Sequence, residues 1–138
     1  MDRSKGFTLL EVMIVVAIVA IMSALAAASY RHYVFRARRA DARQMLMNIA
    51  HAEERWYATY NRYTDDLGKF GYAAAASPDA NYQPMLTVEG DDAQRYVVAA
   101  LPINNQRGDV CGAMTLDSTG KKMPVRADTA ANANGHCW

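Results

Sequence analysis

Few side chains in this chain of 138 residues are placed to do chemistry, and the one under the strongest physical constraint is Glu11. It is the only ionisable residue between Phe7 and Ser29, where every other side chain is apolar or small. At the centre of a membrane helix a charged side chain costs roughly 2.5 to 3.5 kcal/mol on insertion scales, and less near the interface. A carboxylate in this position therefore needs a partner.

The apolar run around Glu11 is long enough to cross a bilayer. A helix over residues 7–29 would measure roughly 34 Å at 1.5 Å per residue. Asp2, Arg3 and Lys5 give the preceding segment a net positive charge, so the positive-inside rule places it in the cytoplasm. The sequence thus predicts a single membrane span, with the bulk of the chain exported.

Two ordinary interpretations of this segment compete. A secretory signal peptide would have a basic start and a small-x-small cleavage pattern, which Ala24-Leu25-Ala26 supplies. However, the run is longer than a typical signal h-region and contains Glu11. A plain membrane anchor fits the length but explains neither Glu11 nor the charged leader that ends in Gly6.

The two cysteines, Cys111 and Cys137, are the next candidates for chemistry. In an exported chain of this size an even pair indicates a disulfide, which would hold the polar tail to the rest of the molecule. The alternative is a metal site with His136, which lacks a recognisable set of further ligands. The other histidines, His32 and His51, are scattered, and no nucleophile, phosphate-binding or metal-binding motif accompanies them. We therefore expect no catalytic site, no cofactor and no metal.

Positive charge is concentrated in two places. Five arginines follow the apolar run and are opposed by a single Asp41; they are Arg31, Arg36, Arg38, Arg39 and Arg43. We expect this basic collar at lipid headgroups and between subunits, rather than on nucleic acid, because it lacks interleaved aromatic residues. Beyond it, acidic residues outnumber basic ones, and the compact basic group there is Lys121, Lys122 and Arg126, the candidate DNA contact.

The elements that must position these residues begin with one long helix. No Pro or Gly interrupts residues 7–60, which would form a helix of roughly 80 Å. Steps of three and four define a face that should pack on a head domain, formed by Leu46, Ile49, Ala50, Glu53, Trp56, Tyr57 and Tyr60. The aromatic members favour core packing over a ligand platform. Asn61 is suited to end the helix.

Strand patterns occupy the second half of the chain. Residues 61–84 lack periodicity and are expected to form a loop, and strands are expected over 85–89, 95–101, 113–116 and 121–125. Asp117-Ser118-Thr119-Gly120 is a turn sequence. The fold class is therefore α+β, with a long helix packed on a small antiparallel sheet. The expected divisions are 1–6, 7–29, 30–60, 61–84 and 85–138.

Residues 6–18, Gly6-Phe7-Thr8-Leu9-Leu10-Glu11-Val12-Met13-Ile14-Val15-Val16-Ala17-Ile18, resemble the class III leader junction of type IV pilins and pseudopilins. The resemblance implies cleavage between Gly6 and Phe7 by a prepilin peptidase and N-methylation of Phe7. It also implies that Glu11 pairs with the α-amino group of a neighbouring subunit's Phe7 and so sets the register of assembly. The helix-breaking Gly and Pro of many major pilins are replaced here by Ala20 and Ala28, so no melted segment is expected.

The resemblance has further implications for the whole chain. Arg62-Tyr63-Thr64 after an aromatic helix end is similar to PilE-like minor pilins, and the near-terminal cysteine pair is usual for pilins. A structural subunit is implied, anchored in the inner membrane and then assembled with other pilins by the pilus machinery into an extracellular fimbrium, with roles such as adhesion or twitching motility. The alternatives are a pseudopilin of a type II secretion system and a minor pilin that binds DNA for uptake.

Overall fold

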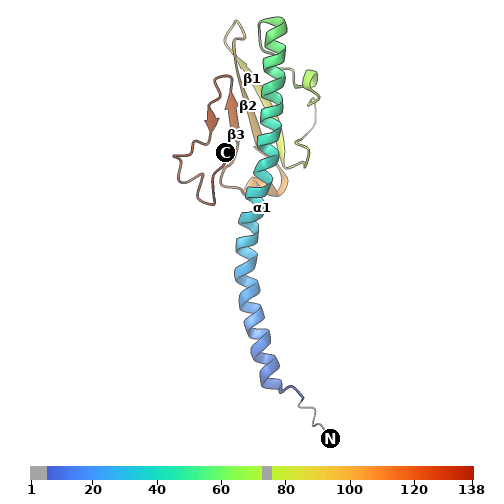
Figure 1. Cartoon of the computed structure of the whole chain (residues 1–138), viewed down its shortest axis with the longest axis vertical. Coiled ribbons are helices and arrows are strands. Elements are labelled where there is room, and N and C mark those ends of the chain that lie inside the picture. Colours follow the sequence, from blue (N-terminus) through green and yellow to red (C-terminus); the bar gives the residue numbers. More distant parts are fainter. Residues whose placement is uncertain (1–5, 73–75) are drawn as a thin grey trace. The chain divides into compact units, whose positions relative to one another are not determined.

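The computed structural model of the protein describes residues 6–72 and 76–138, with the side chain of Ala28 left aside (Figure 1). The chain divides into two units, residues 1–34 and residues 35–138, and each is described by itself. One helix, α1 (Leu9–Tyr60), contributes its first part to the first unit and its second part to the second. The predicted leader, residues 1–6, lies outside the described residues apart from Gly6.

Helix α1 has the extent that the uninterrupted sequence predicts, shortened by two residues at its start. Thr8 precedes the helix, and its hydroxyl accepts a hydrogen bond from the Glu11 amide at 3.3 Å, which is the geometry of an N-cap. At the other end Asn61 adopts φ 53°, the left-handed conformation that commonly ends helices. Both helix ends are therefore set by local side-chain and backbone chemistry.

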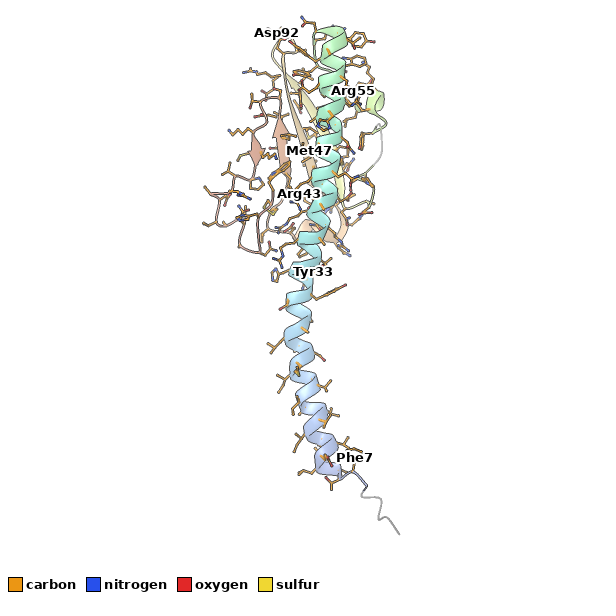
Figure 2. The ribbon with its side chains drawn as sticks, viewed as in Figure 1. Phe7, Tyr33, Arg43, Met47, Arg55 and Asp92 are labelled. Carbon is orange, nitrogen blue, oxygen red and sulfur yellow. A yellow bond between two sulfur atoms is a disulfide. The ribbon has the colours of Figure 1, made fainter. Side chains whose placement is uncertain are left out.

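The first unit is an apolar helix whose side chains are exposed in all directions (Figure 2). Phe7 is 83% exposed, and the large aliphatic side chains of residues 9–25 are each at least half exposed. Among the described residues α1 is the one helix long and apolar enough to cross a membrane, although signal sequences have the same properties. Such an extended apolar surface is suited to contact with lipid or with another protein rather than with water.

The second unit, the head, contains a four-stranded antiparallel sheet in the order β1-β2-β3-β4. Its strands are β1 (Tyr82–Glu89), β2 (Arg95–Pro102), β3 (Met114–Asp117) and β4 (Lys122–Met123). Two short 3-10 helices, η1 (Leu67–Phe70) and η2 (Asn104–Gly108), lie in the connections. The register pairs Leu86 with Val98, and Val98 with Leu116, so these apolar side chains share the buried face.

The structure corrects two boundaries of the sheet. The expected loop over 61–84 is too long, because β1 begins at Tyr82 and η1 forms within the loop. Pro84 lies within β1, which is an edge strand, where a residue without an amide proton is tolerated. The last strand is only Lys122–Met123, shorter than the expected 121–125.

The core of the head lies between α1 and the sheet. The side chains of Met45, Leu46 and Ile49 are fully buried against Tyr82 and Val98 of the strands. The predicted packing face of α1 is wrong at its end: Trp56 and Tyr57 are half-buried and Tyr60 is 53% exposed. The apolar face therefore ends about one turn before the helix does.

The C-terminal segment is tied to the sheet by a disulfide. Cys111 and Cys137, the pair that the sequence predicts to be bonded, are joined with their Cα atoms 5.7 Å apart, and both are buried. Trp138, the last residue, donates its indole proton to the Met123 carbonyl at 2.7 Å. A tail with little regular structure thereby gains a fixed position beside β4.

Candidate functional site

The start of α1 positions the residues that the leader motif singled out. Because Thr8 caps the helix, Gly6 and Phe7 lie before its first turn, and both are exposed. Thr8 and Glu11 have the spacing of a capping box, and an acidic side chain in the first turn also interacts favourably with the helix dipole. The arrangement leaves the Gly6–Phe7 peptide bond outside regular structure.

The basic collar is not a uniform exposed band. Arg39 is fully buried, and its guanidinium forms a two-pronged ion pair with the buried carboxylate of Asp109, at 2.6 and 2.7 Å. The expectation that it belongs to the collar is wrong, because its partner comes from a distant part of the chain. Asp41 is also buried and binds Ser77 and Asn81 instead of the arginines.

The candidate DNA residues gather around β4 and the C-terminus. Lys121, Lys122 and Arg126 are all exposed. The ammonium of Lys122 lies 5.1 Å from the centroid of the Trp138 ring, within the range of a cation–π contact. We call these four residues the β4 patch. It combines positive charge with a half-exposed aromatic ring, the combination that binds phosphates and bases.

The turn before β4 is held by hydrogen bonds to Asp117, next to the lysines of the β4 patch. The carboxylate of Asp117 accepts hydrogen bonds from the Thr119 amide and hydroxyl at 2.9 and 2.6 Å and from the Lys121 amide at 3.0 Å. The hydrogen bond from the Thr119 hydroxyl is the largest cause of a lowered pKa at Asp117. The carboxylate of Asp117 therefore binds groups within the turn, and the side chains of Lys121 and Lys122 are exposed to solvent.

A second basic and aromatic surface was missed by the sequence analysis. Three adjoining depressions of about 300 to 400 Å³ follow α1 beside the segment that contains η1, and Lys69 lines all three. We call this surface the helix-side groove. Its other positive side chains are Arg55 and Arg62, and its aromatic side chains are Trp56, Tyr60, Tyr63, Phe70 and Tyr72.

Only part of this groove could have been found from the sequence. His51 and Arg55 are four residues apart on α1, so they share one side of the helix. Figure 2 shows Arg43, Met47 and Arg55 following one another along α1 within the head. Nothing in the aperiodic loop indicated that Lys69 and Phe70 would line the same depression as Arg55.

The groove also contains a close cation–aromatic contact. The ammonium of Lys69 lies 4.4 Å from the centroid of the Trp56 ring, and the Tyr60 ring lies 4.1 Å from Trp56 on a centroid basis. The Trp56 ring is thus already in contact with Lys69 and Tyr60. The ring of Tyr60 is more exposed, so it is the aromatic ring more accessible to a ligand. No cluster of three metal-binding side chains occurs in the part of the chain that the structure describes.

Comparison with known proteins identifies the class of this molecule. Residues 1–27 match the prokaryotic N-terminal methylation motif, and residues 28–115 match the family described as "Type IV minor pilin ComP, DNA uptake sequence receptor". The chain belongs to the type IV pilin family. Within it, the chain belongs to the group that carries this minor-pilin description.

Individual relatives agree with this assignment. A major pilin, PilE, from Neisseria gonorrhoeae is 34% identical over 78% of this chain and 62% of its own length. The fimbrial protein EcpC from Eikenella corrodens is 32% identical over 92% of this chain and 72% of its own length. The major pilin PilA from Myxococcus xanthus is 29% identical, and only 45% of it is covered, so this chain spans about half to two thirds of such relatives.

A solved structure supports the fold directly. The type IV pilin from Shewanella oneidensis is similar with a TM-score of 0.57 and 30% sequence identity, over 75% of this chain and 97% of that one. The architecture expected from the sequence, a long helix packed on a small antiparallel sheet, is confirmed by the structure and by this likeness. The family is structural rather than enzymatic in the descriptions of these relatives.

Proposed function

We propose that the chain is a minor subunit of a type IV pilus that binds DNA through its head. In this proposal a prepilin peptidase cuts after Gly6, Phe7 is N-methylated, and the apolar helix holds the subunit in the inner membrane until it joins other pilins in the filament. The chain is then a substrate of processing enzymes and not itself an enzyme. The observation that carries the proposal is the Thr8-capped helix start, which leaves the Gly6–Phe7 bond accessible beside a long apolar helix.

Glu11 has a role in this proposal that its position supports. Before assembly its carboxylate lies near the start of the apolar helix, where desolvation is less costly than at the centre. After cleavage the new α-amino group of a neighbouring subunit's Phe7 can supply the missing positive charge. A buried carboxylate that finds such a partner favours one axial register over others.

DNA binding is proposed for the head because the matched family is described as a DNA uptake sequence receptor and because this chain carries the β4 patch. Lys121, Lys122 and Arg126 can contact phosphates, and the Trp138 ring can contact a sugar or base edge. The relatives described as pilins and fimbrial proteins favour a pilus over a secretion pseudopilus.

The test is salt-dependent binding of labelled duplex DNA to the full chain in detergent micelles, followed by fluorescence anisotropy. Removing one lysine or arginine that binds a phosphate should reduce the slope of log K against log salt by about 0.9. We expect Lys121→Ala with Lys122→Ala to weaken binding and reduce the slope by up to about 2. The matched control, Arg95→Ala with Arg107→Ala, removes the same charge from exposed sites elsewhere in the head and should change the slope little.

A third variant locates the contact. Replacing Arg55, Arg62 and Lys69 by alanine removes the positive charge of the helix-side groove and leaves the β4 patch intact. Loss of binding in this variant alone would move the DNA site to the groove. The DNA part of the proposal would be overturned if the wild-type chain did not bind DNA, or if the patch variant and the groove variant both bound DNA as tightly as the wild type. Neither result would affect the proposal that the chain is a pilus subunit.

A further inference from the structure

Glu53 is a carboxyl group that no part of the proposed function uses. It lies on α1 about two turns before the helix ends, and its side chain is fully buried. One oxygen, Oε2, accepts a hydrogen bond from the Thr64 amide at 3.2 Å. The other, Oε1, is buried and has no hydrogen-bond partner among the described residues. A buried carboxylate that accepts a hydrogen bond at only one of its two oxygens is poorly stabilised in its ionised form.

The charges around Glu53 do not compensate for this burial. From α1 it is faced by the acid Glu54, and from the following segment by Asp65, both of which oppose its ionisation. Lys69 is the cation that favours the ionised form, but its ammonium lies over the Trp56 ring and is 3.4 Å from the Thr64 hydroxyl. Two phenols, Tyr63 and Tyr96, also interact with Glu53, and their own pKa values are raised, mainly by burial.

Burial is the largest cause of a raised pKa at Glu53, which reaches about 7 from an ordinary 4.5. The hydrogen bond from the Thr64 amide acts in the opposite direction but is outweighed. The group therefore changes charge close to neutral pH in the closed structure. If the carboxyl becomes exposed to water, its pKa returns toward the ordinary value, so ionisation favours the exposed arrangement.

The segment that contacts Glu53 lies between two turns of the backbone. Residues 64–70 lie between two positions with left-handed backbone, Asn61 at φ 53° and Gly71 at φ 82°. The segment contacts α1 through the Thr64–Glu53 hydrogen bond and through Lys69 and Phe70, which both contact Trp56. Leu67 and Phe70 are partly buried against the core of the head. The depressions of the helix-side groove border it along α1.

We propose that Glu53 is a pH-operated clasp that holds residues 64–70 closed on α1 while its carboxyl is neutral and releases them when it ionises. Opening admits water to the carboxylate and lengthens or breaks the hydrogen bond from the Thr64 amide. It also separates Lys69 from Trp56 and so reshapes the helix-side groove. The clasp rests on the geometry around Glu53 and is independent of whether the head binds DNA.

Hydrogen exchange measured by mass spectrometry on the full chain in detergent micelles tests the clasp between pH 4.5 and 8. After correction for the intrinsic pH dependence of exchange, opening of the peptide that contains Thr64 should increase on the order of 100-fold across this range. Peptides from β2 and β3 should show no such increase. A wild-type chain without excess exchange at Thr64 would overturn the proposal without any variant.

Three substitutions distinguish the effect of Glu53 from that of its neighbours. Glu53→Gln is nearly isosteric and cannot ionise, so the pH dependence of opening at Thr64 should disappear. Glu54→Gln, on the exposed side of the helix, leaves Glu53 able to ionise and should retain the pH dependence, with a smaller increase because Glu54 also opposes the ionisation of Glu53. Asp65→Asn removes an opposing charge, so the pKa of buried Glu53 should fall toward its ordinary value and the total increase in opening with pH should be smaller. An unchanged pH dependence in Glu53→Gln would overturn the clasp.

Discussion

Arg39 and Asp109 form a fully buried, two-pronged ion pair between α1 and the turn after η2, with nitrogen–oxygen distances of 2.6 and 2.7 Å. The remaining donors of Arg39 bind the backbone carbonyls of Gly135 and His136 at 2.8 and 3.2 Å and the side chain of Asn134. Asp109 also accepts from Gln106 at 3.0 Å. This pair is the point where the helix, the sheet connection and the disulfide-bonded tail meet.

Removing one member of this pair should be strongly destabilising. Arg39→Met leaves the Asp109 carboxylate buried without a cation, and changes of this kind cost about 3 to 5 kcal/mol. The free energy of unfolding in urea can be followed by tryptophan fluorescence, since both tryptophans lie in the head. Arg38→Met is the control, and it should change stability by less than about 1 kcal/mol. The double variant Arg39→Met with Asp109→Leu should recover part of the loss, and a fully additive loss would contradict the coupling.

The disulfide should stabilise the fold by an amount comparable to the Arg39–Asp109 pair, because it restricts the unfolded chain. Its cysteines are 26 residues apart, and closing a loop of that size stabilises a fold by about 3 to 4 kcal/mol in the chain-entropy model. The double variant Cys111→Ser with Cys137→Ser should lose that stability in urea unfolding. It should also become more sensitive to protease between residues 125 and 136, because the tail is then held mainly by the Arg39 contacts and by those of Trp138 with Met123 and Lys122. Protease resistance equal to that of the wild type would mean that those contacts hold the tail unaided.

The long helix and the fold class could be predicted from the sequence because their signals are local. An unbroken run without Pro or Gly and a left-handed residue at Asn61 fix α1 within two residues. The buried role of Arg39 could not be predicted, since five arginines occur close together and nothing local distinguishes the one whose partner lies 70 residues away. The helix-side groove was missed for the same reason, because Lys69 reaches Trp56 only through the folded path of an aperiodic loop.

The turn before β4 gives a pH-dependent prediction with a defined sign. Hydrogen bonds from Thr119 and Lys121 stabilise the ionised Asp117, so its pKa is lower in the folded chain than its ordinary value of 3.8. This contribution is present at neutral pH and is lost as the pH falls through the lowered pKa. Asp117→Ala should cost about 1 kcal/mol at pH 7, measured by urea unfolding. The difference from the wild type should shrink below pH 3, and a constant difference at all pH values would mean that ionisation of Asp117 is irrelevant.

Glu11 provides the prediction that separates membrane insertion from assembly. Glu11→Gln removes a charge from the apolar helix, so insertion should be unimpaired or improved, since charged side chains are costly in lipid. If the carboxylate pairs with the α-amino group of a neighbouring Phe7, the same change should reduce the amount of the subunit in sheared surface filaments by at least about tenfold, because it leaves that amino group buried without a counter-charge. The membrane fraction should keep a processed chain that begins at Phe7.

The control for Glu11 is Glu54→Gln, which removes a carboxylate of the same kind from an exposed site in the head and should leave the filament fraction unchanged. Mass spectrometry of the N-terminus distinguishes the steps, because a failure of cleavage at Gly6 would retain the leader. Glu11→Asp keeps the charge on a shorter side chain and should be intermediate if distance to the amino group matters. A Glu11→Gln subunit that enters filaments at the wild-type level would show that the charge pair does not set the register, and packing of the apolar helix would then have to do so alone.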